Sequence, residues 1–323
     1  MRRILIFAVA LFVVTACENR QWPEIVMPEN EVCYDDPVTN GAADPVLIWN
    51  HKSKQWVMYY TQRRANMENP QGVEWAHGCS IGIATSPDGS KWTYWGVCQG
   101  DKMLSNTDPE KRHTWWAPDV ITDENGLFHM FVTYVPNITT DWSGSRDIRH
   151  YTSEDGFNWQ FQSVLPLQAE RCIDPCVKKI GDSWYMWYKN ESAGSHTWMA
   201  KSPNLYDWEV VGEMTSDLAH EAPYVWEWDG KYWMIVDAWT KHMRIYTSAD
   251  GLSGWEFSSE ITPGGHPAVY IIQGKPVIIG HEMCGEIVEV GAAVKGDWKA
   301  GQKVVIQPEG GEEKSFLRKA VAI

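Results

Sequence analysis

The stretch Thr152-Ser153-Glu154-Asp155-Gly156-Phe157-Asn158-Trp159 contains a tight turn followed by a tryptophan, and the pattern recurs along the chain. Its copies end at Trp92, Trp159, Trp208 and Trp255, which are 67, 49 and 47 residues apart. Four short strands and their turns need about 40–50 residues, which is the length of one propeller blade. The repeat therefore predicts a β-propeller, with these four tryptophans in the core.

A second motif precedes each turn, and it places a proline next to an acid or a histidine before a β-branched run. Its copies are Asp44-Pro45, Pro118-Asp119, Asp174-Pro175, Glu221-Ala222-Pro223 and His266-Pro267. We expect partner strands after each start, at 55–61, 127–134, 183–188 and 231–236. Five starts predict an all-β, five-bladed β-propeller. The sequence pattern changes after residue 273, so we expect the fifth blade to be atypical or incomplete.

The composition of the 323-residue chain excludes several classes of protein. Its 28 basic and 42 acidic residues give a net charge of −14, which argues against a nucleic-acid partner. With 44% hydrophobic and 22% charged residues, it is neither disordered nor a multi-span membrane protein. The 20 tryptophans and 13 tyrosines suggest aromatic blades or a sugar-binding surface.

The N-terminus resembles an export signal. Arg2 and Arg3 precede an apolar run, and Val14-Thr15-Ala16-Cys17 resembles the lipobox of bacterial lipoproteins, in which the cysteine carries the lipid. We therefore expect a signal peptide at 1–17, a lead-in at 18–39, and an exported protein anchored to the cell envelope through Cys17. A plain secretory signal is the alternative.

Six cysteines remain after Cys17, and none has metal-ligand spacing. A hairpin around Ser86-Pro87-Asp88-Gly89 would place Cys79 opposite Cys98, and two interpretations of this pair stay open. The first is a disulfide in an oxidising compartment, and the second is two thiols packed within a blade.

The first strand of every propeller blade lines the central axis. The repeated starts therefore bring Asp44, Asp119, Asp174, Glu221 and His266 towards one mouth of the channel. Gathered carboxylates are costly unless they bind a cation or divide acid and base roles. Asp119 follows its proline, so we expect it to lie off the catalytic pair, as a substrate or structural ligand.

Residues 40 to 273 resemble the five-bladed glycoside hydrolases of family 43, because Asp44-Pro45, Trp116-Ala117-Pro118-Asp119, Ile173-Asp174-Pro175 and His220-Glu221-Ala222-Pro223 match its blade signatures in order and spacing. The resemblance implies an inverting hydrolase of plant or algal polysaccharides that requires no cofactor. It makes Asp44 the general base, Glu221 the general acid and Asp174 the residue that tunes the acid. It also implies that His266 contacts an axial water or a structural calcium.

The chemistry of inverting hydrolysis agrees with these roles. One carboxylate activates water while a protonated one delivers a proton to the leaving oxygen. We expect Asp174 to raise the pKa of Glu221 by like-charge repulsion. Asp36 competes with Asp44 as the base, but no β run follows it. The alternative function is a sugar-binding propeller lipoprotein without catalysis.

Several residues beside the strand starts are candidates for binding sugar. Trp115, Trp116, Trp142 and Trp239 would stack on sugar rings. His220 is either a second acid or a structural histidine. The arginines on loops or beside strand starts would meet an acidic sugar or would be ordinary surface residues: Arg63, Arg64, Arg146, Arg149 and Arg171.

The C-terminal segment differs from the rest of the chain. Residues 277–308 resemble part of a zinc-dependent medium-chain alcohol dehydrogenase, and that resemblance makes His281 a zinc ligand. The other zinc cysteines and a Gly-x-Gly-x-x-Gly loop are missing, so we expect no dehydrogenase activity. We place the propeller at 40–275 and this atypical segment at 276–323, with runs at 286–290 and 303–307 as substitute outer strands of the fifth blade.

Overall fold

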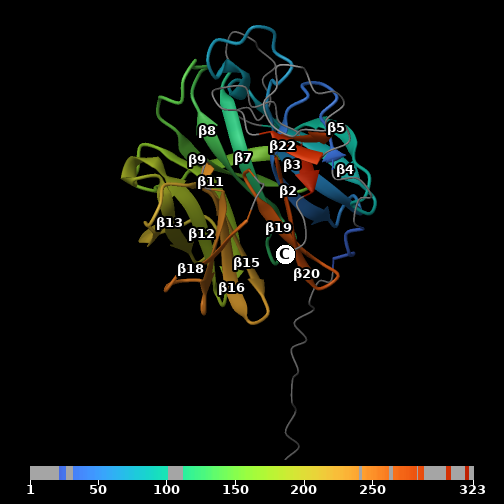
Figure 1. The fold of residues 1–323 in the computed structure, drawn as a ribbon. Helices are drawn as coiled ribbons and strands as arrows, with labels where there is room; N and C mark the ends of the chain where they lie inside the picture. The colour runs from blue at the N-terminus through green and yellow to red at the C-terminus, as the bar shows by residue number, and fades with distance from the viewer. Residues whose placement is uncertain are drawn as a thin grey trace, which may run out of the picture.

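The computed structural model describes residues 22–26, 32–100, 112–239, 242–261, 265–281, 283–286, 303–306 and 317–319. The protein is a β-propeller in which antiparallel sheets surround a common axis (Figure 1). Each predicted partner strand is present within one or two residues of its expected bounds. The signal peptide and Cys17 lie outside the described residues.

Four complete blades are built from consecutive strands. The first contains β2 (Ala42–Asn50), β3 (Gln55–Gln62), β4 (Ser80–Ser86) and β5 (Thr93–Val97). The second contains β7 (Thr114–Thr122), β8 (Phe128–Val135), β9 (Asp147–Ser153) and β10 (Asn158–Val164), with β6 (Gln99–Gly100) parallel to β10. The third contains β11 (Cys172–Ile180), β12 (Ser183–Asn190), β13 (His196–Ser202) and β14 (Glu209–Thr215). The fourth contains β15 (Glu221–Trp228), β16 (Lys231–Asp237), β17 (Met243–Ser248) and β18 (Glu256–Ile261).

The fifth position in the ring holds a sheet of a different kind. A hairpin of β19 (Ala268–Ile272) and β20 (Lys275–His281) is extended by β23 (Leu317–Lys319) and then by β1 (Val32–Tyr34), so both ends of the chain contribute. The prediction of five blades is therefore not confirmed as such, since four complete blades are described. The expectation that the fifth would be atypical is correct. The inner strands form a closed circle of neighbours, because β19 contacts both β15 and β2.

The dehydrogenase-like segment is not separate from the propeller. Strand β20 runs across the expected boundary at 275 and pairs with β19. The predicted outer strands are wrong, because β21 (Met283–Glu286) pairs with β22 (Lys303–Ile306) in a sheet of their own. The outer positions of the fifth sheet are filled by β23 and β1 instead. Two short 3-10 turns, Glu74–Ala76 and Glu191–Ala193, complete the described elements.

Apolar clusters fill the spaces between blades. One cluster joins the first two blades around Tyr59, Trp115 and Trp159, and another joins the second and third around Phe131 and Trp208. Trp92 and Trp255 pack at the edge of a third cluster. The prediction of core tryptophans is thus correct for Trp159 and Trp208, whereas Trp92 and Trp255 are only partly buried. Face-to-face packing of sheets explains why each blade needs them.

The turns before these tryptophans repeat one local hydrogen bond. The backbone N–H of Gly89 donates to Ser86 Oγ at 2.8 Å, and Gly156 and Gly251 donate to Ser153 and Ser248 in the same way. Cys79 and Cys98 are buried and are not joined by a disulfide, since the Cys98 N–H donates to Ile81 O and places Cys98 opposite Ile81, not Cys79. The disulfide prediction is therefore wrong, and the alternative of packed thiols is correct. No helix in the described part of the chain is long and apolar enough to span a membrane.

Candidate active site

A β-bulge with left-handed backbone opens the inner strand of each sheet. The residue immediately before the proline has a positive φ at all five starts: Asp44 (52°), Ala117 (45°), Asp174 (58°), Ala222 (52°) and His266 (43°). In the four complete blades the strand register shifts across this residue. Proline keeps the preceding residue out of the right-handed helical region, and non-glycine residues with positive φ store strain of about 1–3 kcal/mol. Such strain is concentrated at functional sites.

This bulge corrects the predicted alignment of the five acidic or histidine positions. Only Asp44, Asp174 and His266 occupy the residue before the proline. Glu221 lies one residue earlier, and Asp119 lies two residues later than the bulge residue Ala117. Asp119 lies further along its inner strand, where its carboxylate accepts the Val177 N–H and lines the cavity that Asp44, Asp174 and Glu221 do not line. The structure therefore separates Asp119 from the acids at the mouth.

Asp44 is buried and is surrounded by positively charged or hydrogen-bonding groups. Its Oδ1 lies 3.1 Å from an Arg63 guanidinium nitrogen, 3.1 Å from His281 Nδ1 and 3.4 Å from His266 Nδ1. Burial by itself would raise the pKa of Asp44, but Arg63, His266 and His281 together hold it well below its usual range. Asp44 is therefore ionised at neutral pH, as a general base must be.

Asp174 has the opposite electrostatic setting. Its backbone N–H donates to Thr133 Oγ1 at 3.1 Å, and its Oδ2 accepts the N–H of Ala222, also at 3.1 Å. The pKa of Asp174 is raised to about 6. Burial is the main cause, and the negative charges of Glu221 and Asp44 add to it, while His266 and Lys189 partly oppose it. Asp174 therefore holds a proton at mildly acidic pH.

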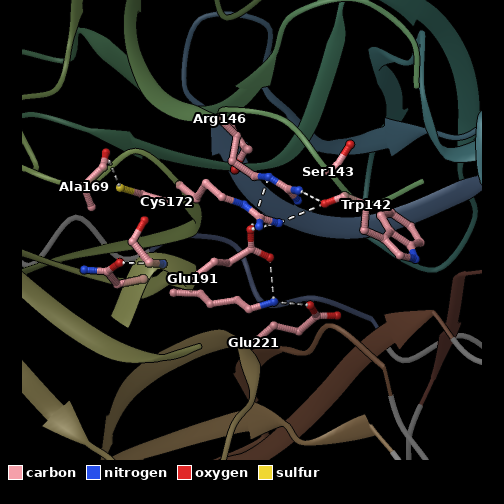
Figure 2. Close-up of polar contacts among 12 residues, drawn as sticks. Trp142, Ser143, Arg146, Ala169, Cys172, Glu191 and Glu221 are labelled. Atoms are coloured by element: carbon pink, nitrogen blue, oxygen red, sulfur yellow. Dashed lines mark hydrogen bonds and ion pairs between the residues drawn. The ribbon is translucent and has the colours of Figure 1, made fainter. Parts of the chain in front are cut away.

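Glu221 is tied to a network of cations (Figure 2). Lys189 Nζ lies 3.0 Å from Glu221 Oε2 and 3.0 Å from Glu191 Oε1. The second oxygen of Glu191 contacts Arg146 Nε at 3.2 Å and Arg171 at 3.1 Å. Both arginines also donate to Trp142 O. Glu191 thus holds Lys189 in place against Glu221.

The charge on Glu221 differs from the prediction. Burial would raise its pKa, but the Lys189 amine, together with His266 and a hydrogen bond from Trp239, lowers it below its ordinary value. The expectation that Asp174 would raise the pKa of Glu221 above its ordinary value is therefore wrong. Two carboxyl groups that interact this closely titrate as a pair, and the proton of this pair resides mainly on Asp174.

The predicted sugar-binding tryptophans divide into exposed and buried ones. Trp142 and Trp239 are 49% and 42% exposed, and Trp239 lies 5.0 Å from Lys189 Nζ. Trp116 is buried against Trp142, with its Nε1 donating to Ala76 O at 2.7 Å. Trp115 is completely buried between the first two blades, so its prediction as a substrate contact is wrong.

His220 and Asp119 are structural in this fold. His220 is fully buried, with Nε2 2.7 Å from Thr197 Oγ1 and Nδ1 2.7 Å from Leu218 O, and burial lowers its pKa to about 4. A substrate cannot reach the buried His220 ring, so the prediction of His220 as a substrate contact is wrong. Asp119 accepts the Val177 N–H at 2.5 Å and so links the second and third inner strands. Asp36, the competing base, is buried and accepts hydrogen bonds from Tyr60 and Gln62.

A cavity of about 940 Å³ lies further along the inner strands, away from the acids at the mouth. Asp119, Lys178, Trp184, Tyr224 and Tyr270 line it, whereas Asp44, Asp174 and Glu221 do not. Lys178 and Tyr224 are in contact within it, with 3.3 Å between Nζ and the phenol oxygen. The acids that are suited to chemistry are at the other end of these strands, so we place the candidate active site there.

Sequence reasoning missed Lys189 and assigned His281 to a zinc site. Both residues lie at or near the end of the second strand of a sheet, where Thr61 and Thr133 occupy corresponding places. A polar residue recurs near the end of each aromatic second strand, and this recurrence is the sequence signal that could have revealed Lys189 and His281. Of the five predicted arginines, Arg63, Arg146 and Arg171 reach the site, while Arg149 pairs with Asp147 and Arg64 donates to backbone carbonyls.

No group of three or more histidine, cysteine, aspartate or glutamate residues in the described ranges is arranged to hold a metal ion. His266 lies beside Asp44, and its backbone N–H donates to Asp237 Oδ2 at 3.2 Å. The expected calcium contact of His266 stays a prediction.

Comparison with solved structures identifies the fold class. The chain is similar to a thermostable family-43 glycoside hydrolase (TM-score 0.56, 18% identity, 87% of this chain and 99% of that chain). It is also similar to a GH43_1 enzyme from Xanthomonas citri complexed with xylotriose, with a TM-score of 0.56 and 13% identity over 75% of this chain and 82% of that chain. A third similar structure is an endo-1,4-β-xylanase from Bacteroides thetaiotaomicron, with a TM-score of 0.53 and 20% identity over 74% of this chain and 84% of that chain. At these identities the likeness establishes the propeller fold of family-43 glycoside hydrolases.

The sequence comparisons are narrower. The family profile of the alcohol dehydrogenase GroES-like domain matches residues 241–319, less than half of the chain. This match covers the dehydrogenase-like segment found in the sequence and also the last two strands of the fourth blade. No curated protein matches the sequence.

Proposed function

We propose that this protein is an inverting glycoside hydrolase with Asp44 as general base and Glu221, paired with Asp174, as general acid. The observation that carries the proposal is the unequal protonation of the acids at the mouth. Asp44 is held ionised, while the Asp174–Glu221 pair holds a proton at mildly acidic pH. Carboxyl groups whose pKa values are pushed apart are the arrangement that divides base and acid roles.

The proposed reaction follows from these charges. Asp44 takes a proton from water while the water oxygen bonds to the anomeric carbon. The bond from that carbon to the leaving oxygen breaks, and Glu221 gives that oxygen the proton of the Asp174–Glu221 pair, which has first moved to it from Asp174. Asp174 supplies the second carboxyl of the pair, so that one proton is shared between two acids. The exposed rings of Trp142 and Trp239 stand near this network as surfaces for sugar.

For the substrate we propose a plant or algal polysaccharide or its oligosaccharides. Similar structures include an enzyme complexed with xylotriose, an endo-1,4-β-xylanase and an exo-β-1,3-galactanase, so xylans and galactans are the first substrates to test. The test is hydrolysis of aryl glycosides and polysaccharides by the wild type, with proton NMR of the first anomer formed. An inverted anomer together with loss of turnover in Asp44→Asn and Glu221→Gln supports the proposal. A retained anomer contradicts the mechanism.

A sugar-binding propeller without catalysis is the second candidate. The ion pair between Glu221 and Lys189 favours it, because an ionised carboxylate is a poor general acid. Binding of oligosaccharides by calorimetry, without any product and with no loss of affinity in Glu221→Gln, would select this candidate.

We further propose export and lipid anchoring at Cys17, on the basis of the lipobox-like sequence. Expression in a bacterium with labelled palmitate provides the test. Label in the wild type and none in Cys17→Ser is expected, and equal labelling would contradict the anchor.

A further inference from the structure

One position recurs at the end of the second strand of every sheet. It lies opposite the residue that precedes the bulge, and the pairings Ala43–Thr61, Trp116–Thr133, Ile173–Lys189 and Glu221–Asp237 define it in the four complete blades. In the fifth sheet Ala268 pairs with Ile279, and the backbone N–H of His281 donates to Gly265 O at 3.0 Å. His281 therefore occupies the fifth copy of this position.

This position reaches across to the next sheet. Thr61 Oγ1 accepts the N–H of Ala117 at 2.8 Å, and Thr133 Oγ1 accepts that of Asp174 at 3.1 Å. Asp237 Oδ2 does the same for His266 at 3.2 Å. His281 completes the circle, because its Nδ1 lies 3.4 Å from the backbone nitrogen of Asp44 on the first blade. A residue of the dehydrogenase-like segment thus closes the propeller at Asp44.

His281 makes one contact that the threonines do not make. Its Nδ1 is nearer to the Asp44 carboxylate than to the backbone, at 3.1 Å from Oδ1. Burial and Arg63 lower the pKa of His281 against the opposing pull of Asp44, so the ring is neutral. With its proton on Nδ1, a neutral imidazole donates to the carboxylate at 3.1 Å, and the Asp44 backbone nitrogen at 3.4 Å is then a neighbour of this nitrogen and not a second hydrogen-bond partner. Arg63, His266 and His281 all contact the same oxygen of this carboxylate, Oδ1.

We propose that His281 is a positioning residue for Asp44, and that the dehydrogenase-like segment serves the hydrolytic site instead of a zinc site. With Arg63 and His266, His281 fixes the rotation of the carboxylate by holding one of its oxygens. The proposal rests on the proposed function, in which Asp44 is the general base. It assigns His281 no contact with substrate.

The kinetic test compares three variants. His281→Leu removes the donor, and we expect kcat to fall about 100-fold with KM within about twofold, because a misplaced catalytic group costs about that much. His281→Asn keeps a donor near the place of Nδ1 and should recover kcat to within about tenfold of wild type. Thr61→Val is the matched control, since Thr61 holds the bulge at Ala117, where there is no carboxylate. It should lower thermal stability and leave kcat within about twofold.

Equal kcat losses in His281→Leu and Thr61→Val, or no rescue by His281→Asn, would show a purely structural role and overturn the proposal. Nitrogen-15 NMR of the histidine rings tests the contact without any substrate. We expect a proton on His281 Nδ1 in the wild type, and a changed Nδ1 shift in Asp44→Asn. Absence of either result overturns the positioning role even in an active enzyme. Presence of both in a protein that hydrolyses no glycoside supports the contact and refutes only the proposed function.

Discussion

Replacing Lys189 with methionine tests the division of charge at the mouth of the propeller. Lys189 Nζ lies 3.0 Å from both Glu221 and Glu191, and it is the main group that lowers the pKa of Glu221. In the wild type the Asp174–Glu221 pair must carry a proton to act as the acid. Because the pKa of Asp174 is about 6, activity is lost as the pH rises through that value. Each pH unit above it removes about tenfold of the acid form, so kcat/KM at pH 8 should be about 100-fold below its plateau.

Lys189→Met removes the charge that stabilises ionised Glu221, so the pKa of the pair rises and the alkaline limb moves to higher pH. The fall in kcat/KM between pH 6 and 8 should therefore be smaller than in the wild type. Loss of one partner of a buried ion pair also costs about 3–5 kcal/mol of unfolding free energy. We expect the lower end of that range, because Arg146 and Arg171 still neutralise Glu191.

The assay is kcat/KM for an aryl glycoside from pH 4 to 8.5, with urea unfolding of the same proteins. Lys189→Arg keeps the cation and should keep the wild-type limb. Lys179→Met removes an exposed lysine paired with Glu124 and should change neither measurement. An alkaline limb that stays in place or moves to lower pH in Lys189→Met would refute the assignment of this lysine.

Three other predictions follow from the same structure. Asp174→Asn should abolish turnover but raise the unfolding free energy at pH 8 by about 3 kcal/mol, and this gain should vanish below pH 4. The reason is that the pKa of Asp174 is about 6 in the folded protein and 3.8 in the unfolded chain, so the carboxyl costs stability only once the pH exceeds the unfolded value. Trp142→Ala should raise KM for an oligosaccharide about fivefold through lost stacking, whereas Trp95→Ala, an equally exposed ring on an outer strand, should not. Because Cys79 and Cys98 are separate buried thiols, dithiothreitol should leave the melting temperature unchanged, and a shift of several degrees would contradict their placement.

The repeats in the sequence predicted the propeller correctly because each blade repeats the same physical problem. A tight turn, a buried tryptophan and a proline before the inner strand are local requirements, so each leaves a local signature. The same logic identified Asp44 and Asp174, which precede their prolines. It failed for Trp115, because this ring packs between the first two blades instead of facing the mouth.

The sequence by itself determined the all-β class, the positions of the inner strands and the acids near their starts. Only the tertiary structure decided the charges of those acids, because Lys189 and His281 come from second strands, Arg63 directly follows one, and all three act across space. It also decided that the dehydrogenase-like segment forms part of the fifth sheet. A pKa depends on every charge within several ångströms, and in a propeller those charges come from different blades far apart in the chain.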